Sequence, residues 1–592
     1  MNYFPLNEND AYIRIFGQIF TELDTSLLEK DAIDSFQALS IGGRYLATRL
    51  FCRTHKFVPK SQMIKYLPAE ELDPAIDELI THKWLDQPSN LEEVLESASL
   101  PELTLMAENF GVNRSNKAMI RSRLQEKCKV VAHFGQTPLS KRVVDYFTRH
   151  FTYYRLSQLM QSLEKAVFMY LLPSYGASMD IIVRRNMKMM HFSSYEYFSQ
   201  RERPLFDSKK SFDSYYEARQ LIDSIEEATD ISEDVLEQVV TLERVEGGVF
   251  SSARVLGRGL HLAARILGKR ARFMEEYEWT NLYLAQSTHR RYRAENLIRK
   301  LLLELKFYKE QSDTVWLRRS LNTYFDASLE VSEAEKLDLS RKAHKLMSYF
   351  RKENMDIPDL LIDVKCGIPI REELADLNES SKTRTLWGSA KCTVEELALS
   401  IYAVQGWEGG HFENGMISTI FWLMFHDIIF SYKEGFRNDI QARPLSVQKA
   451  LDECRSLISQ RLELDLGEHL TKSHAVLMDA KPIIGGINYD IPIECLVAFV
   501  SQSGARGVLE RLAANGELSG FPDLTLWNSN GECKIVEVKS TNDTVSDTQQ
   551  IWMQTLLRLG YDVEICKIRG KRGNTLQKEL VETSKKVKVV KR

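Results

Sequence analysis

Several features common in specialised proteins are scarce in this 592-residue chain. Its eight cysteines form no C-x-x-C pair, which argues against zinc fingers and ribbons. Only 29 glycines and 15 prolines are present, so long helices are expected rather than a loop-rich all-β fold. The longest apolar run, 420–425, is too short to cross a bilayer. No basic segment followed by an apolar stretch opens the chain, so we expect no signal peptide.

The chain also has no large excess of one charge, because 78 Lys and Arg residues nearly balance 82 Asp and Glu residues. A net charge of −4 excludes a globally basic, histone-like DNA binder but allows local basic patches. The segment 567–592 is basic; it is either a solvated tail or a nucleic-acid contact. The scattered thiols favour a reducing compartment, so we expect a cytoplasmic protein with no membrane partner.

The hydrophobic pattern divides the chain into four expected domains. Residues 1–95 show three short helices and a short hairpin, which would suit a winged-helix-like module. Residues 96–130 form a two-helix unit, and residues 131–392 resemble a tetratricopeptide-like helical array without its strict period. Residues 393–592 form an α/β domain with the basic tail. The expected fold is therefore multidomain and mostly α, with a C-terminal α/β domain.

Basic residues in the two helical regions are candidates for weak DNA contacts. Contacts of this kind neutralise phosphate charge, whereas a solvated helix face is the ordinary alternative for each cluster. The candidates are Lys117, Arg121, Arg123, Arg290, Arg291, Arg293, Arg318 and Arg319.

The stretch 520–540 contains the most informative chemistry. Two β-rich runs flank the turn Ser529-Asn530-Gly531, which predicts a hairpin, and a helix and a third strand follow. Because strand side chains alternate between faces, Glu537 and Lys539 share one face of an otherwise apolar strand. An unpaired charge there is costly, and a cation bound by Glu537 and Asp523 would remove that cost.

These residues form the P-D…E-x-K arrangement. Two carboxylates hold a divalent cation, which stabilises charge on a phosphate, and the lysine holds or deprotonates the attacking water. The Glu-x-Lys triplet alone is weak evidence for such a site, because Glu304-Leu305-Lys306 and Glu532-Cys533-Lys534 also match it. Specificity comes from P-D before a strand, V-E-V-K within a strand, and Gln549-x-x-Trp552 in the following helix. The pattern predicts a metal-dependent phosphodiesterase.

The segment 520–566, with G-F-P-D-L-T-L-W and K-I-V-E-V-K-S, resembles the VRR-NUC (virus-type replication-repair nuclease) domain of the PD-(D/E)XK superfamily. Blocks at 393–399, 406–415 and 427–438 narrow the resemblance to the Fanconi-associated nuclease family, and the chain looks like a bacterial-type member. The resemblance implies a C-terminal restriction-endonuclease-like domain. Within 96–130, the pattern L-x-L-M-A-x-x-F-G-V-x-R-S-N-K-A-M-I resembles a SAP module, a DNA-binding helical hairpin, and this unit fits the order of that family; an ordinary helical hairpin is the alternative.

By this resemblance, a third carboxylate comes from a helix before the hairpin, at Glu413 in H-x-E-x-G, with Glu408 as the nearby alternative. The implied cofactor is Mg²⁺ or Mn²⁺. The implied metal ligands are Glu413, Asp523, Glu537 and the Val538 carbonyl. The implied catalytic residues are Asp523, Glu537, Lys539, Glu413 and Gln549.

Three further positions qualify this site. Gln549 matches a glutamine that aligns the site in such nucleases, although an exposed helix residue is the alternative. His411 could bind metal, but a hydrogen-bonding or capping role is the favoured interpretation. Eukaryotic members have a lysine directly before Gln-x-x-Trp that helps hold a substrate 5′ phosphate; this chain has Thr548 there, which puts such a pocket in doubt.

The resemblance implies an enzyme that cuts DNA at 5′ flaps or branched structures, with 5′-to-3′ exonuclease action, in the repair of interstrand crosslinks. Such a protein would act as a monomer or homodimer, associated with the nucleoid when bound to DNA. Two other functions stay open. One is a non-catalytic helical-repeat scaffold with a relic nuclease fold, and the other is a sequence-specific restriction-type endonuclease.

Overall fold

The computed structural model describes residues 10–53, 56–129, 137–174, 178–227, 232–286, 292–356, 360, 367–375, 377–380, 385–387, 392–515, 518–540 and 543–570. The chain divides into two compact units. Unit 1 contains Met1–His191, Tyr197–Lys209 and Arg437–Gln441, and unit 2 contains Phe192–Glu196, Lys210–Phe436 and Ala442–Arg592. Helices predominate in both, as the low glycine and proline content indicated.

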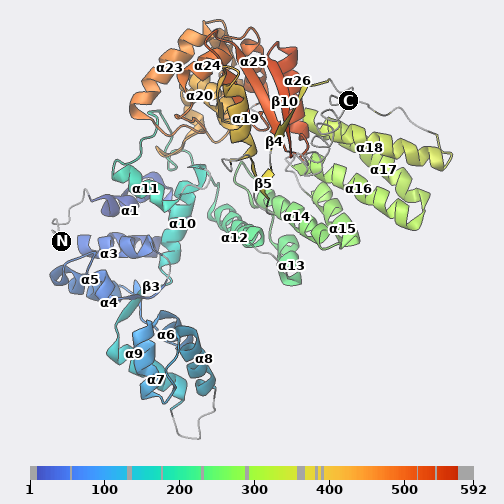
Figure 1. Cartoon of the computed structure of the whole chain (residues 1–592). Helices are drawn as coiled ribbons and strands as arrows, with labels where there is room; N and C mark the ends of the chain where they lie inside the picture. Colours follow the sequence, from blue (N-terminus) through green and yellow to red (C-terminus); the bar gives the residue numbers. More distant parts are fainter. Residues whose placement is uncertain are drawn as a thin grey trace, which may run out of the picture. The chain divides into compact units, whose positions relative to one another are not determined.

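Unit 1 consists of helices around three short strands (Figure 1). Its α-helices are α1 (Ala11–Glu22), α2 (Lys30–Gln37), α3 (Ile41–Phe51), α4 (Lys60–Met63), α5 (Ala69–Thr81), α6 (Leu91–Ser97), α7 (Leu100–Asn109), α8 (Lys117–Cys128), α9 (Leu139–His150), α10 (Met160–Leu171) and α11 (Met179–Asn186). Its strands are β1 (Val58–Pro59), β2 (Leu85–Asp86) and β3 (Tyr153–Leu156).

The prediction of a short hairpin within residues 1–95 is wrong. Strands β1 and β2 each pair antiparallel with β3, which lies between them in the sheet. The central strand therefore comes from residues beyond the two-helix unit. A local hydrophobic pattern could not reveal this pairing, because strand partners that are distant in sequence leave no turn signal.

The two-helix unit predicted at 96–130 is present as α7 and α8. The Asn116 side chain caps α8 by accepting a hydrogen bond from the Met119 N–H at 2.9 Å. Leu103 and Met106 of α7 are buried against Ile120 of α8 in one hydrophobic core. The DNA-binding role of this hairpin stays a prediction.

A short piece of the later chain, Arg437–Gln441, belongs to unit 1. Asn438 is buried and donates a hydrogen bond to the Tyr170 carbonyl at 2.7 Å. The Asp439 carboxylate accepts from Arg185 at 2.7 Å, while burial raises the pKa of Asp439. The block containing Phe436-Arg437-Asn438 thus has a structural use within unit 1.

Unit 2 begins with successive antiparallel helices that correspond to the predicted array (Figure 1). Residues of α14 and α15 share one hydrophobic core, and residues of α16, α17 and α18 share another. That these helices form a tetratricopeptide-like array stays a prediction. The helices are α12 (Lys209–Glu227), α13 (Glu233–Thr241), α14 (Ser252–Lys269), α15 (Phe273–Gln286), α16 (Arg293–Gln311), α17 (Thr314–Glu330) and α18 (Glu333–Lys352).

A five-stranded mixed sheet forms the centre of the rest of unit 2, in the order β4-β10-β9-β8-β7. Its strands are β4 (Ile370–Ala375), β7 (Glu408–His411), β8 (Leu524–Trp527), β9 (Cys533–Lys539) and β10 (Asp562–Gly570). Strands β8 and β9 form the predicted hairpin, and β10 runs parallel to β9 after helix α26 (Asp547–Arg558). The predicted order of strand, strand, helix and strand is confirmed. Strand β4, which precedes residue 393, also joins this sheet.

Helix α19 (Val394–Ala403) packs on one face of the sheet, where Leu524, Val536 and Val538 are buried against Ala398. A capping box between Thr393 and Glu396 begins this helix. The remaining helices are α20 (Asn414–Phe430), α21 (Val447–Glu453), α22 (Arg455–Leu462), α23 (Leu466–Ala480), α24 (Ile493–Val500) and α25 (Ala505–Asn515); strands β5 (Leu377–Ser380) and β6 (Thr385–Trp387) pair separately.

Among the described residues, no single helix combines the length and apolarity needed to cross a membrane. One sharply bent pair of helical segments, Met160–Ser174 with Met179–Asn186, is long and apolar enough for a membrane span by length and composition alone.

Candidate active site

Three neighbouring strands bring the predicted site residues together. Leu524 of β8 pairs with Val536 of β9, so the antiparallel register places Asp523 opposite Glu537. His411 of β7 pairs with Leu524, and the next two backbone N–H groups, of Phe412 and Glu413, donate to the Asp523 carbonyl at 3.1 and 3.2 Å. Asp523 is therefore held between the other two segments of the site.

Glu537 is fully buried, with 0% of its surface exposed, in the middle of β9. The Lys539 amine lies 2.5 Å from its Oε1, as the shared strand face predicted. Neither Glu537 oxygen, however, accepts a well-oriented hydrogen bond from any described residue. Burial, followed by the neighbouring Asp523 charge, raises the Glu537 pKa to about 7, against the opposing effect of Lys539.

Asp523 is fixed by its backbone and by its side chain. Its Oδ2 accepts a hydrogen bond from the Val538 N–H at 2.8 Å, which ties the carboxylate to β9. Burial raises its pKa, while the Val538 N–H and the Lys539 charge act in the opposite direction. Two carboxylates that share a buried site in this way favour either a proton or a cation.

Glu413 lies where β7 gives way to α20. It is the N-cap residue of α20 and has φ 45° and ψ −135°, a region that non-glycine residues rarely adopt. Such strain persists only where contacts hold it, and here the Asp523 carbonyl accepts from Glu413 while the Glu413 carbonyl accepts from Met416. Ligand atoms of His411, Glu413 and Asp523 lie within 4.8 Å of one another. The structure thus places Glu413 with the P-D…E-x-K residues.

Gln549 has a local contact that sequence reasoning did not anticipate. Its Oε1 accepts from the Ser546 N–H at 3.0 Å, completing a capping box at the start of α26. The same helix packs on the loop before Asp523, because the Trp552 indole donates to the Ser519 carbonyl at 2.9 Å. Gly520, with φ +81°, lies against Thr548, where an added Cβ would come within 2.7 Å of the Thr548 Cβ. Helix α26 therefore supports the segment that carries Asp523.

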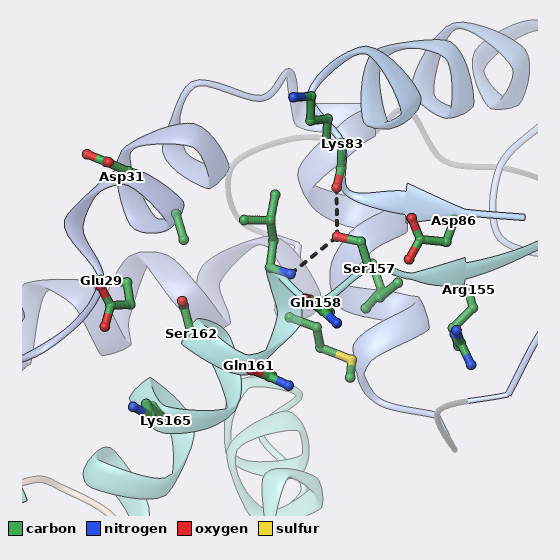
Figure 2. Close-up of a pocket in the computed structure, with 14 residues that line it drawn as sticks. Glu29, Asp31, Lys83, Asp86, Arg155, Ser157, Gln158, Gln161, Ser162 and Lys165 are labelled. Atoms are coloured by element: carbon green, nitrogen blue, oxygen red, sulfur yellow. Dashed lines mark hydrogen bonds between the residues drawn. The ribbon is translucent and has the colours of Figure 1, made fainter. Parts of the chain in front are cut away.

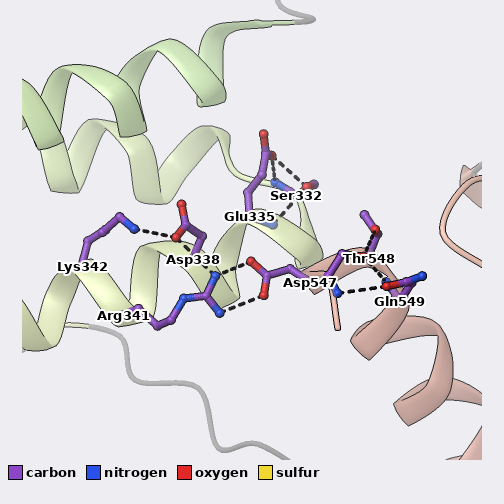
Figure 3. A network of polar contacts seen from close by, with 9 residues as sticks. Ser332, Glu335, Asp338, Arg341, Lys342, Asp547, Thr548 and Gln549 are labelled. Carbon is purple, nitrogen blue, oxygen red and sulfur yellow. Dashed lines mark hydrogen bonds and ion pairs between the residues drawn. The ribbon is translucent and has the colours of Figure 1, made fainter. Parts of the chain in front are cut away.

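The first turn of α26 is joined to the helical array by ion pairs (Figure 3). Arg341 of α18 donates to both carboxylate oxygens of Asp547, with Nη1–Oδ1 at 2.8 Å. Asp338, one turn earlier in α18, lies near Arg341 and accepts from Lys342 at 2.7 Å. Nothing in the spacing of the sequence signalled this contact between positions 341 and 547.

Four of the six candidate DNA-contacting residues that the structure describes are seen with intramolecular partners. Arg121 donates to the Glu96 carbonyl at 2.7 Å, and Arg123 to the Asn113 carbonyl at 3.3 Å. Arg293 pairs with Glu330 at 3.0 Å, and Arg319 stacks on Trp316 at 4.8 Å. Lys117 and Arg318 belong to the described residues, whereas Arg290, Arg291 and the basic segment 571–592 lie outside them. The DNA contacts of the set stay predictions.

Two of the cavities among the described residues lie away from this site. One in unit 1, of about 890 Å³, lies at the start of α10 and is lined by residues of both charges, among them Glu29, Asp31 and Lys165 (Figure 2). There the Ser157 hydroxyl donates to the Lys83 carbonyl at 2.6 Å. The other, of about 500 Å³ in unit 2, includes His426 and Asp427. Neither is lined by the carboxylate cluster, which lies within β9, directly before β8 and just after β7.

The side chains of the cluster suit a divalent cation. Glu537 has buried carboxylate oxygens without normal hydrogen-bond donors, Asp523 lies opposite it, and Glu413 adds a carboxylate beside Asp523. Oxygen ligands of this kind suit hard cations such as Mg²⁺ and Mn²⁺. A bound cation would replace the proton that burial otherwise favours on Glu537.

Comparison with known proteins places this site in a class. The VRR-NUC domain model matches residues 487–570, which include β8, β9, α26 and β10. The Fanconi-associated nuclease 1 homolog of Schizosaccharomyces pombe is 26% identical over 91% of this chain and 88% of its own length. Fanconi-associated nuclease 1 of Danio rerio is 25% identical over 95% of this chain, which spans 65% of the zebrafish protein.

A solved structure agrees over nearly the whole chain. The crystal structure of paFAN1 bound to 5′ flap DNA with a two-nucleotide flap and a gap has a TM-score of 0.73, at 18% identity, over 96% of this chain and 100% of that one. The predicted fold class, mostly α with a C-terminal PD-(D/E)XK-type nuclease domain, is confirmed. The chain is therefore similar to Fanconi-associated nucleases over nearly its whole length, and its C-terminal part matches the VRR-NUC nuclease domain. This match implies a divalent metal ion.

Proposed function

We propose that the protein is a structure-selective, metal-dependent DNA nuclease that cuts 5′ flaps and degrades DNA in the 5′-to-3′ direction. The observation that carries the proposal is the fully buried Glu537, opposite Asp523 and 2.5 Å from the Lys539 amine. Two buried carboxylates that share a single lysine are costly to keep ionised unless they bind a cation. The relatives named nucleases, and the paFAN1 complex with 5′ flap DNA, support this substrate class.

In this mechanism Asp523, Glu537, Glu413 and the Val538 carbonyl would hold Mg²⁺ or Mn²⁺, and the ion would supply positive charge against the scissile phosphate. Lys539, held beside Glu537, would orient the attacking water, whose proton passes to solvent. In-line attack on phosphorus would break the bond to the 3′ oxygen, which takes up a proton from water, and leave a 5′-phosphate product. Gln549, at the start of α26, helps to align these groups. The N-terminal and array helices bind the duplex arms of a branched substrate. Because Thr548 carries no charge, a terminal phosphate of the substrate is bound by other groups.

The setting of this activity is part of the same proposal. We infer a role in the repair of interstrand crosslinks, by a monomer or homodimer in a bacterial cytoplasm that associates with the nucleoid when bound to DNA. The name of the family and the likeness to paFAN1 support this setting.

The test uses end-labelled 5′ flap, 3′ flap, splayed and plain duplex DNA, each incubated with Mn²⁺ or with EDTA. Wild type should cut the 5′ flap near its junction only with metal, and Asp523→Asn should lose this cut. Asp562→Asn is the matched control, because Asp562 is an exposed carboxylate of the same sheet that pairs with Lys534. Binding of DNA without any cutting would favour a scaffold with a relic fold, and cutting of plain duplex at a fixed sequence would favour a restriction-type endonuclease.

A further inference from the structure

We propose that the imidazole of His411 is a ligand of the active-site metal, a nitrogen donor beside the carboxylates of Glu413 and Asp523. The inference rests on the proposed function, because it adds a ligand to the same site. It changes the composition of that site from all-oxygen to mixed nitrogen and oxygen, which bears on the choice of ion.

Distances support a single ion among these three side chains. Their ligand atoms all lie within 4.8 Å of one another. An ion with bonds of about 2.1 Å holds its ligands at most about 4.2 Å apart, so small side-chain rotations bring all three onto it. His411 Nε2 is already 2.9 Å from Glu413 Oε1, which is the separation of two adjacent ligands on one such ion.

The backbone fixes His411 and Glu413 in this arrangement. His411 ends β7 in register with Leu524, the residue directly after Asp523. The Phe412 and Glu413 N–H groups both donate to the Asp523 carbonyl, and Glu413 has a positive φ of 45°. Backbone strain of this kind is maintained at sites where it orients functional groups. Here it turns the chain so that Glu413 meets the side chain of His411, two residues earlier.

Asp523 has one oxygen available for this ion. Its Oδ2 accepts from the Val538 N–H at 2.8 Å, which points that oxygen toward β9 and Glu537. The side chains of His411 and Glu413 are partly exposed, with 38% and 56% of their surfaces accessible, so an ion and its remaining waters can reach them. Asp523 thus lies between Glu537 with Lys539 on one side and His411 with Glu413 on the other.

A nitrogen ligand has a chemical consequence. Imidazole suits transition metals, whereas Mg²⁺ prefers carboxylate, carbonyl and water oxygens. The site should therefore bind Mn²⁺ in preference to Mg²⁺. His411→Gln should weaken Mn²⁺ binding about tenfold and Mg²⁺ binding by less than about threefold.

The decisive experiment is pulsed electron paramagnetic resonance of Mn²⁺ bound to the full-length protein, without DNA, prepared with natural or ¹⁵N-labelled histidine. Wild type should show a directly coordinated nitrogen whose coupling changes with the label, and His411→Gln should lose it. His82→Gln, at an exposed histidine that ends α5, is the matched control and should keep the coupling. Thermal unfolding without metal checks that each variant is folded.

The outcomes separate this inference from the function it rests on. If Mn²⁺ binds wild type and is lost in Asp523→Ala, but no histidine nitrogen couples to it, His411 only donates a hydrogen bond to Glu413 and the inference is overturned. If Asp523→Ala binds Mn²⁺ as well as wild type, the metal site itself is wrongly assigned and both proposals fail.

Discussion

Two Glu-x-Lys triplets of unit 2 have the same spacing, but their lysines pair with different residues. Glu537-Val538-Lys539 lies in strand β9, and Glu304-Leu305-Lys306 lies in helix α16. Both glutamates are buried, with 0% and 1% of their surfaces exposed. In the strand, Lys539 reaches Glu537 at 2.5 Å. In the helix, Lys306 instead pairs with Glu310, one turn later, at 2.7 Å.

The difference follows from the two periodicities. Residues two apart share a face of a strand but point in different directions from a helix. The Glu304 carboxylate accepts from the Tyr277 hydroxyl at 3.0 Å, so the array supplies it with a neutral donor. Glu537 has another carboxylate opposite it and a lysine beside it. The Glu-x-Lys motif therefore brings its two side chains together in the strand but not in the helix.

The largest expected effect separates the two lysines. Lys539→Ala should reduce single-turnover cleavage of a 5′ flap at least about a thousandfold, because the attacking water loses the group that positions it. Lys306→Ala should leave the cleavage rate within about twofold, since its pair with Glu310 is a surface contact.

Rate measurements at saturating enzyme, together with flap binding in EDTA, would check this contrast. Both variants should bind the flap as tightly as wild type. Retained cutting by Lys539→Ala would remove the lysine from the mechanism.

The two glutamates should differ in how stability responds to metal and pH. The Glu537 pKa is raised from 4.5 to about 7, so between these values the folded protein holds a proton that the unfolded chain has lost. Folding stability in EDTA should therefore be highest below this window and fall as the pH rises through it. Glu537→Gln cannot ionise, and at pH 8 it should be more stable than metal-free wild type by as much as about 3 kcal/mol.

Thermal unfolding across pH 5 to about 8, with EDTA or Mn²⁺, measures this difference. Mn²⁺ should raise the Tm of wild type and of Glu304→Gln, with the rise shrinking below about pH 7 as Glu537 is protonated. It should leave the Tm of Glu537→Gln almost unchanged. An equal rise in that variant would place the ion elsewhere.

A smaller effect should appear where the array meets α26. Arg341→Ala and Asp547→Ala each remove the same paired contact, so their effects on unfolding free energy should be coupled by about 0.5–1 kcal/mol. The pair is partly exposed, with 44% and 25% of the side-chain surfaces accessible, which limits its value. Urea unfolding of the two single variants and the double variant gives this coupling, and strict additivity would show that the contact contributes nothing.

The smallest effect belongs to the helical triplet. Glu310→Gln removes one member of an i,i+4 pair with Lys306 and should cost about 0.3–0.5 kcal/mol at low salt. Urea unfolding at low and high salt would measure it. A loss that does not shrink as salt is added would mean that Glu310 acts through packing rather than charge.

Much of the site could be predicted from sequence because its main signals are local. The hairpin, the shared face of Glu537 and Lys539, the following helix and the final strand all follow from strand alternation and turn residues within about fifty positions. The capping box of Thr393 and Glu396 and the cap at Asn116 were visible for the same reason. Glu413 was reached only through the family resemblance, since no local pattern links it to Asp523.

Tertiary structure decided what depends on distant partners. The central strand β3, the Arg437–Gln441 segment of unit 1 and the Arg341–Asp547 pair all join positions far apart in the chain. The strained backbone of Glu413, which brings its side chain to His411 and Asp523, depends on hydrogen bonds to another strand. Sequence by itself determined which residues share a strand face, because that follows from backbone periodicity. Only the folded sheet determined which strands lie side by side, because burial and pairing are properties of the whole chain.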